Sequence, residues 1–205
     1  MSNRIFESNE NDPQQYYWFR NALSEDEVDQ IIRLASELPE GETASTLGES
    51  DGGSTRTSKI KWLPDTPNGE FEWLYERMVS LSVEANTALW DFDLRTSLEA
   101  IQYTEYYASE EGHYDWHQDI GEGALPSKRK ISITIQLSDS DDYEGGDLEI
   151  CTGSNGSGQL DNNIICERGK GVGVLFPSYM MHRVSPVTKG LRRSLVLWVG
   201  GGHYR

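Results

Sequence analysis

Hydrophobic positions with helical spacing occur in two stretches near the beginning of the chain. After the apolar run YYWFRNAL at residues 16–23, Ser24 stands three positions before Glu27, the pattern of a capping box at a helix N-terminus. The apolar positions that follow keep helical spacing up to Leu38, and the next residue, a proline, ends the pattern. A second stretch of this kind predicts a helix over residues 68–89.

The rest of the chain has a different pattern. Between the two predicted helices, residues 40–58 are rich in Gly, Ser and Thr, which predicts a long loop. After about residue 91, short β-branched and aromatic runs separated by Gly, Asp, Asn and Pro predict seven or eight strands. This order indicates an α+β fold in which helices buttress a β-sandwich. Since no boundary is visible, we expect residues 1–205 to form a single domain.

Composition and charge limit the possible partners and compartments. The 34 acidic and 18 basic residues give a formal charge of −16, which disfavours binding to a phosphate backbone, so we expect no nucleic-acid partner. The polar N-terminus and the lack of a long apolar run predict neither a signal peptide nor a membrane span. Cys151 and Cys166 could pair, but such sparse cysteine fits a reducing compartment better, so we expect a cytoplasmic protein.

The stretch GHYDWHQDIG at residues 112–121 is the first candidate for chemistry. It contains two of the four histidines, in the His-x-Asp pairs His113/Asp115 and His117/Asp119. Such a pair offers an imidazole and a carboxylate to a metal, although a polar surface strand has the same pattern. On an extended strand all four side chains face the same way, so alternation does not choose between the two pairs.

Two downstream segments favour the metal interpretation. GVGVLFPSYMMHRV at residues 171–184 predicts an apolar strand and a turn followed by His182, and GLRRSLVLW at residues 190–198 places Arg192 and Ser194 on one strand face. An Arg in a buried strand is costly unless it meets an anion, and its planar fork matches a carboxylate. Two histidines and one carboxylate leave metal positions open, as in non-haem Fe(II) oxygenases, and the Arg/Ser pair then suggests a small dicarboxylate that chelates the iron.

The chain resembles the 2-oxoglutarate/Fe(II) dioxygenases, specifically their prolyl-4-hydroxylase-like branch. The resemblance covers residues 16–200 and is densest from Tyr103 to Trp198. It rests on three segments in this order: TEYYASEEGHYDWHQD, RKISITIQLSDSDDYEGGDLEI and LFPSYMMHRVSPVTKGLRRSLVLW. It implies a double-stranded β-helix core of the jelly-roll or cupin-like type over about residues 95–200, buttressed by the N-terminal helices.

The resemblance also chooses between the two His-x-Asp pairs. In the family the metal-binding pair follows an aromatic residue three positions earlier, with a Gly shortly before it, and Tyr114 and Gly112 match this arrangement. His117 and Asp119 are thereby implied as metal ligands, with His182 as the distal ligand. These three residues, together with the family's arginine, are the implied catalytic set.

That arginine binds the C5 carboxylate of 2-oxoglutarate in the family, and Arg192 holds its position here. Arg193, of opposite parity, is expected to point away. Further expected contacts of the co-substrate are Ser194, Thr134, Gln136 and either Tyr106 or Tyr107. Expected contacts of the substrate are Tyr114 and two residues in or beside the long loop, Arg56 and Trp62, the alternative for the latter two being a solvated loop.

The implied reaction is oxidative decarboxylation of 2-oxoglutarate coupled to hydroxylation of a C–H bond, with Fe(II) as the metal, O2 as the oxidant and ascorbate as a possible reductant. Succinate and CO2 are the expected by-products. The negative charge of the chain favours a neutral or basic peptide over a nucleobase, so we expect a peptidyl residue such as proline as the substrate. Two alternatives stay open: a hydroxylase of a free amino acid or small metabolite, and a non-catalytic binding module on the same fold.

Overall fold

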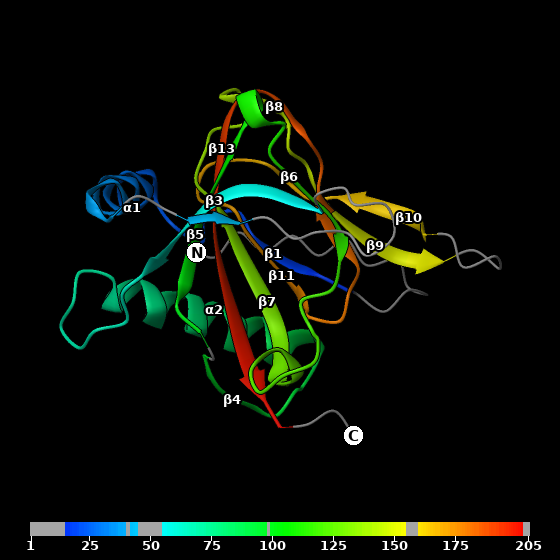
Figure 1. Cartoon of the computed structure of the whole chain (residues 1–205). Coiled ribbons are helices and arrows are strands. Elements are labelled where there is room, and N and C mark those ends of the chain that lie inside the picture. Colours follow the sequence, from blue (N-terminus) through cyan, green and yellow to red (C-terminus); the bar gives the residue numbers. More distant parts are fainter. Residues whose placement is uncertain (1–14, 40–41, 45–54, 98, 155–159, 203–205) are drawn as a thin grey trace.

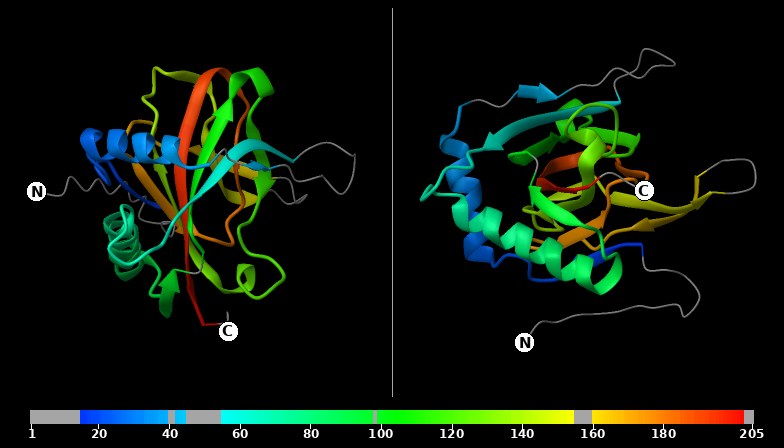
Figure 2. Two further views of the ribbon diagram at one scale, coloured as in Figure 1. Left: turned by 60° about the vertical axis from the view of Figure 1, so that its left-hand side comes forward. Right: turned by 90° about the horizontal axis from the view of Figure 1, so that it is seen from below.

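The computed structural model describes the chain over five ranges: residues 15–39, 42–44, 55–97, 99–154 and 160–202. Antiparallel strands curl into two facing layers, and the two helices lie outside one of them (Figure 1 and Figure 2). This is the predicted α+β fold with a double-stranded β-helix core. Within the described ranges, no helix has both the length and the apolar character needed to cross a membrane.

Both predicted helices are present. The first, α1 (Glu25–Glu37), begins at the predicted capping box: the Glu27 backbone N–H donates to Ser24 Oγ at 3.2 Å, and the Ser24 N–H donates to the Glu27 carboxylate at 2.8 Å. The second, α2 (Glu72–Leu89), begins later than residue 68. Asn68 has a φ of 56°, in the left-handed region, which is incompatible with a right-handed helix and delays its start.

The strands form one hydrogen-bonded path in the order β1-β11-β7-β13-β5-β3-β6-β12-β9-β10, with β2 paired to β3 and both β4 and β8 paired to β13. The path from β1 to β3 is the layer that the helices cover, and the path from β6 to β10 is the facing layer. Their bounds are β1 (Tyr17–Phe19), β2 (Glu42–Ala44), β3 (Arg56–Leu63), β4 (Leu94–Ser97), β5 (Ile101–Tyr107), β6 (His113–His117), β7 (Arg129–Gln136), β8 (Tyr143–Gly145), β9 (Leu148–Ser154), β10 (Leu160–Ile165), β11 (Gly173–Pro177), β12 (His182–Val184) and β13 (Val187–Gly201). Two short 3-10 helices, η1 (Ala108–Glu110) and η2 (Pro126–Lys128), lie before β7.

Strand β3 joins the two layers. Its first residues pair with β6, where Arg56 lies opposite Tyr114, and its later residues pair with β5 in the helix-covered layer. The prediction of a loop over residues 40–58 is therefore wrong at its end, because residues 56–58 begin β3, and also at residues 42–44, which form β2. Arg56 and Thr57 pair with β6, which lies far along the chain and leaves no local signal, and β2 pairs in turn with β3.

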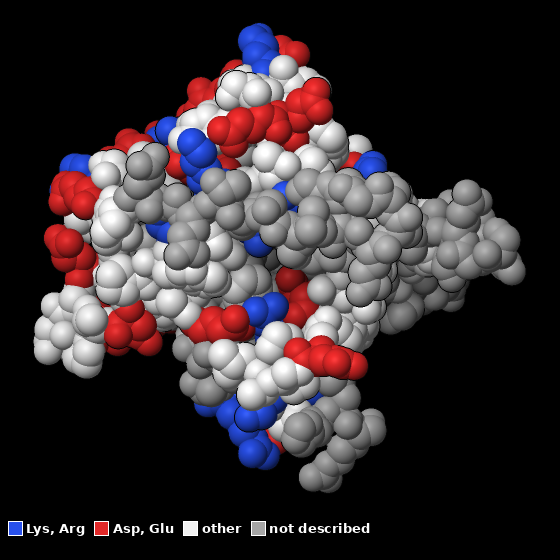
Figure 3. Space-filling view, in the orientation of Figure 1, with Lys and Arg blue, Asp and Glu red and all other residues white. Residues whose placement is uncertain are grey.

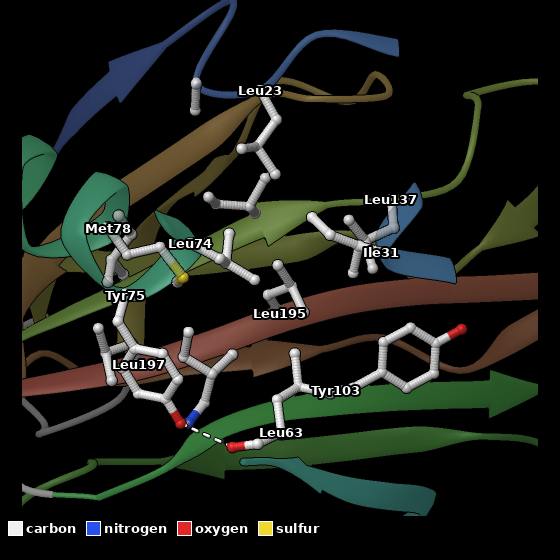
Figure 4. Close-up of a cluster of buried hydrophobic side chains, with 14 of the residues drawn as sticks. Leu23, Ile31, Leu63, Leu74, Tyr75, Met78, Tyr103, Leu137, Leu195 and Leu197 are labelled. Carbon is white, nitrogen blue, oxygen red and sulfur yellow. Dashed lines mark hydrogen bonds between the residues drawn. The ribbon is translucent and has the colours of Figure 1, made fainter. Parts of the chain in front are cut away.

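The main hydrophobic core lies between the helices and the layer that they cover (Figure 4). Leu74 and Met78 of α2 have no exposed surface there. The buried Tyr75 hydroxyl donates to the Leu63 carbonyl oxygen at 2.7 Å and accepts from the Ile101 N–H at 2.9 Å, so its polar group is satisfied. The core thus holds this layer from outside and leaves its inner face free to line a cavity.

The two cysteines lie in different parts of the facing layer. Cys151 is in β9 and Cys166 follows β10, and both are buried. Burial raises the pKa of the Cys166 thiol to about 12. The sequence left their pairing open, and the structure has no disulfide between them.

Candidate metal and co-substrate site

A central cavity lies between the inner faces of the two layers. Of the residues that the sequence predicts for a site, nine line this cavity: Arg56, Tyr106, Tyr114, His117, Asp119, Thr134, His182, Arg192 and Ser194. Two predicted residues, Gln136 and Trp62, do not belong to its wall. The fold thus collects side chains from β3, β5, β6, β7, β12 and β13 around one space.

Two histidines and one carboxylate form a compact cluster in the cavity. His117 ends β6, Asp119 follows it closely, and His182 begins β12. One possible ligand atom from each residue lies within 4.8 Å of the other two. The Nε2 atoms of His117 and His182 lie 3.7 and 3.5 Å from the two oxygens of the Asp119 carboxylate. This is a donor set that suits a non-haem Fe(II) centre with open positions.

Hydrogen bonds orient both imidazoles toward this cluster. His117 Nδ1 lies 2.7 Å from the Asp115 carbonyl oxygen, and His182 Nδ1 lies 2.9 Å from the Met180 carbonyl oxygen. A carbonyl oxygen only accepts hydrogen bonds, so each Nδ1 donates, and in a neutral ring Nε2 is then the nitrogen with the free lone pair. Metal-binding histidines are commonly held in this way.

A β-bulge in β6 decides which of the two His-x-Asp pairs enters the cluster. His117 lies opposite His182, whereas Tyr114 lies opposite Val184, so three steps along β6 match two steps along β12. The extra residue lets both His117 and Tyr114 face the cavity and puts His113 on the opposite parity. His113 instead approaches the Glu111 carbonyl oxygen at 2.8 Å and is absent from the cavity wall.

The electrostatic environment puts the cluster in the state that a cation requires. Burial and the neighbouring His182 lower the pKa of His117 to about 4, so its ring is neutral at pH 7. Burial alone would raise the pKa of Asp119, but the two histidines and a 2.6 Å hydrogen bond from Ser132 Oγ outweigh that effect and hold it below its usual value. A neutral His117 ring and an ionised Asp119 carboxylate bind a metal without first losing protons.

Arg192 projects into the same cavity from β13. Its side chain is 1% exposed, its guanidinium carbon lies 5.2 Å from the Tyr106 ring centroid, and its Nη1 lies 3.4 Å from Ser194 Oγ. Its Nε has no hydrogen-bond partner, and no carboxylate of the described ranges forms an ion pair with it. Arg193, by contrast, points out of the cavity and pairs with Glu105 at 3.1 Å. A buried, unpaired guanidinium is a site for an incoming anion.

The neighbouring strands supply some of the other predicted co-substrate contacts. Tyr106, buried against Arg192, lines the cavity, while Tyr107 points away and donates to Glu105 at 2.9 Å. Of the two tyrosines, Tyr106 is therefore the one that lies in the cavity. Thr134 lines the cavity, but Gln136, the last residue of β7, lies beyond it with its buried Oε1 unpartnered among the described residues.

The predicted substrate contacts are divided between the cavity and the surface. The Tyr114 ring stacks on the His117 ring with 3.4 Å between centroids, and the Arg56 guanidinium carbon lies 4.7 Å from the Tyr114 ring centroid. Both residues are therefore next to the cluster. Trp62 is 43% exposed on β3 and packs beside Trp198, with 6.5 Å between ring centroids, so it lies outside the cavity.

Sequence reasoning missed several residues near the cluster, among them Ser132, which donates to the Asp119 carboxylate. Gln102 lines the cavity and shares its parity on β5 with Tyr106, a signal that strand alternation could have supplied. Arg129 donates to the Asp119 carbonyl oxygen at 2.9 Å while it binds the Glu99 carboxylate through two hydrogen bonds of 2.7 Å. No local sequence pattern predicts these two contacts, because neither Glu99 nor Asp119 is a close neighbour of Arg129 in the sequence.

Known proteins resemble the part of the chain that contains the cluster. Residues 101–200 match the family model of the 2OG-Fe(II) oxygenase superfamily. PKHD-type hydroxylases are among the relatives: one from Alteromonas mediterranea is 33% identical over 96 residues, covering 44% of this chain and 39% of the relative. Another, from Synechococcus sp. (strain CC9605), is 30% identical over 133 residues, covering 65% and 56%. The chain thus spans about half the length of these relatives or less.

Solved structures share the fold over nearly the whole chain. A prolyl hydroxylase from Trichoplax adhaerens, in complex with a hypoxia inducible factor peptide fragment, aligns with a TM-score of 0.68 and 18% identity over 91% of this chain and 83% of that one. A prolyl-4-hydroxylase from Pseudomonas putida aligns with a TM-score of 0.61 and 19% identity over 92% and 93%. At these identities the likeness establishes the fold.

The segment that contains the cluster and Arg192 thus belongs to the 2OG-Fe(II) oxygenase superfamily. In sequence this part of the chain is similar to PKHD-type hydroxylases, and its fold is that of prolyl hydroxylases. The superfamily implies Fe(II), 2-oxoglutarate and O2, and the residues fit these groups. The cluster offers two imidazole nitrogens and one carboxylate to iron, and the unpaired Arg192 offers a guanidinium to a carboxylate.

Proposed function

We propose that this chain is a 2-oxoglutarate- and Fe(II)-dependent dioxygenase that hydroxylates a C–H bond of a peptidyl residue such as proline, with release of succinate and CO2. A single observation carries the proposal. One cavity contains both the His117–Asp119–His182 cluster and a fully buried arginine that pairs with no described carboxylate. A binding module that had lost catalysis would have no need to keep both features.

The residues divide the work as follows. His117, Asp119 and His182 hold Fe(II) through two Nε2 atoms and one carboxylate, and the chemistry that Fe(II) supplies when bound is the activation of O2. Arg192 donates to the C5 carboxylate of 2-oxoglutarate, whose negative charge pairs with the buried guanidinium. Further co-substrate contacts come from Ser194, Tyr106 and Thr134, which line the cavity around Arg192.

The substrate is proposed to approach past Arg56 and Tyr114. These side chains stack beside His117, and an Arg over an aromatic ring offers donors to peptide carbonyl oxygens. The peptide bound to the Trichoplax adhaerens prolyl hydroxylase, which shares the fold, supports a polypeptide substrate. The charge of −16 supports a neutral or basic one, and Figure 3 shows several groups of acidic side chains, with basic ones among them, on the face that it displays.

Turnover assays test the proposal directly. The purified chain, supplied with Fe(II), 2-oxoglutarate and ascorbate, is expected to release succinate faster when a basic proline-containing peptide is added, and the peptide is expected to gain one oxygen atom by mass spectrometry. The Asp119→Ala variant serves as the control without an intact cluster. Stimulation by a free amino acid but by no peptide would replace the peptide substrate with a small metabolite. Absence of metal-dependent turnover with every substrate would favour a binding module.

The extent and location of the enzyme complete the proposal. We infer that residues 1–205 act as one dioxygenase domain with its core over about residues 95–200, since the described strands join in one path. The cytoplasmic location expected from the sparse cysteines stays a prediction, as does the absence of a nucleic-acid partner.

A further inference from the structure

Three side chains stack on the outer face of the cluster's two strands. Arg183 of β12 donates from Nε and Nη2 to the two oxygens of the Glu149 carboxylate at 2.9 and 3.0 Å. Its guanidinium carbon also lies 4.8 Å from the centroid of the Trp116 ring. Trp116, Arg183 and Glu149 are termed the outer clamp. A two-point bond and a ring contact hold the planar guanidinium in one orientation, which an exposed lysine could not match.

Each part of the outer clamp adjoins the cluster. Trp116 directly precedes His117, and Arg183 directly follows His182. Glu149 lies opposite Arg183 in the β9–β12 pair. Because consecutive residues of a strand point to opposite faces, the clamp lies outside the layer while the two histidines face the cavity. The clamp therefore lies on the outer side of β6 and β12, the two strands that carry the imidazoles on their inner side. Glu149 extends it to β9.

The clamp acts on the β-bulge that orients His117. The bulge residues Asp115 and Trp116 together oppose Arg183, because His117 pairs with His182 and Tyr114 with Val184. The Asp115 carbonyl oxygen, which belongs to the peptide group between these two residues, accepts the Nδ1–H of His117 at 2.7 Å. Any rotation of this peptide would move the acceptor that points Nε2 at the cluster.

Two further hydrogen bonds hold this peptide and the one before it. The Asp115 N–H donates to the Thr55 carbonyl oxygen at 2.8 Å, and the Trp116 N–H donates to the Asp115 carboxylate at 2.7 Å. These bonds fix Asp115, and among the described residues the Arg183 guanidinium stacks on the Trp116 ring. With both residues fixed, the peptide between them has one orientation.

We propose that the outer clamp positions His117 for metal binding by holding the bulge peptide from the outside. The inference rests on the proposed function, since it assumes that the cluster binds a divalent cation. None of the three clamp residues touches the cation or a substrate, so they are positioning residues. Their effect is expected in metal affinity, with little effect on the Arg192 side of the cavity.

Calorimetric titration of Mn(II) into the full chain tests this role. Arg183→Ala and Trp116→Ala are each expected to raise the Kd for Mn(II) about tenfold, the lower end of the range for changes in groups that orient a metal ligand. Trp116→Phe, which keeps a ring under the guanidinium, is expected to restore nearly wild-type affinity. The double variant Trp116→Ala/Arg183→Ala is expected to lose no more than either single variant, because both act through one stack.

Arg193→Ala is the matched control. It removes a cross-strand Arg–Glu pair of similar length, 3.1 Å to Glu105, from the outer face of the other layer. Urea unfolding of every variant separates a general loss of stability from a loss of metal affinity. If the alanine variants do not fold, Arg183→Gln and Trp116→Leu replace them in the titration, because they keep more of the side-chain volume.

The outcomes are distinct. Unchanged Mn(II) affinity in the folded Arg183 and Trp116 variants would overturn the clamp and leave the proposed function standing. An equal loss of affinity in Arg193→Ala would also overturn it, because the effect would then follow from stability alone. A wild-type chain that binds no Mn(II) would overturn the proposed function itself, and the clamp with it.

Discussion

His117 lies directly opposite His182 in the β6–β12 pair, while Tyr114, three residues before His117, lies opposite Val184, two residues after His182. This mismatch of one residue is the β-bulge that brings Tyr114 and His117 to the same face of the layer. It explains how a strand that starts with one His-x-Asp pair presents only the second pair to the cavity. The local shape of one strand thus selects the candidate metal ligands.

Removal of a candidate ligand is expected to abolish metal binding. His117→Ala or His182→Ala leaves two protein ligands, so the affinity for Fe(II) or Mn(II) should fall by more than the roughly 10–100-fold typical of changes around a ligand. Calorimetry and metal-dependent succinate release measure the effect. His113→Ala is the matched control and should keep most of both. If His113→Ala is the variant that loses the metal, the assignment of the two pairs is wrong.

Arg192→Ala is expected to abolish tight binding of 2-oxoglutarate while metal binding survives. The variant leaves a carboxylate without its charged partner in a buried site, which costs about 2–5 kcal/mol of binding free energy. Titration of 2-oxoglutarate into the Mn(II)-loaded chain measures this loss. Arg193→Ala, which removes only the outward pair with Glu105, should have a mild effect. The reverse result would contradict the direction in which the two arginines point.

The metal-free chain is expected to lose stability as the pH falls from about 6.5 toward 4. The folded pKa of His117 is about 4, below the ordinary value of 6.5, so in this window the unfolded state binds more protons than the folded state. Stability therefore rises with pH across the window and is lost as the pH drops through it. Urea unfolding at pH 7 and pH 5 measures the difference. In His117→Ala the difference in unfolding free energy between pH 7 and pH 5 should shrink. An equal difference in the wild type and the variant would contradict the assignment of this pH dependence to His117.

Salt is expected to weaken the binding of a basic peptide substrate. Steering by the excess negative charge acts between exposed groups and is screened over about 8 Å at physiological ionic strength. The apparent affinity for a basic proline-containing peptide should therefore fall as salt rises, with little change in the turnover rate. An uncharged peptide of the same length is the control. An affinity independent of salt would remove the electrostatic argument for a basic substrate.

Much of the fold follows from local pattern. The capping box at Ser24 and the helical spacing after it predict α1, and β-rich runs after residue 91 predict a strand-built domain, because these features depend on neighbours in sequence. The parity of β13 likewise places Arg192 and Ser194 on one face and Arg193 on the other. Local pattern failed at the start of β3, where Arg56 lies in a strand that pairs with the distant strands β5 and β6.

The sequence by itself determined which types of residue the candidate site contains. The tertiary structure decided which of the residues of each type line the cavity. Strict alternation puts His113 and His117 on the same face, and only the bulge opposite Arg183 separates them. Strand register also chose Tyr106 over Tyr107 and left Gln136 beyond the cavity wall. The physical reason is that register and bulges are set by hydrogen bonds between strands far apart in the chain, and local residue order does not record those bonds.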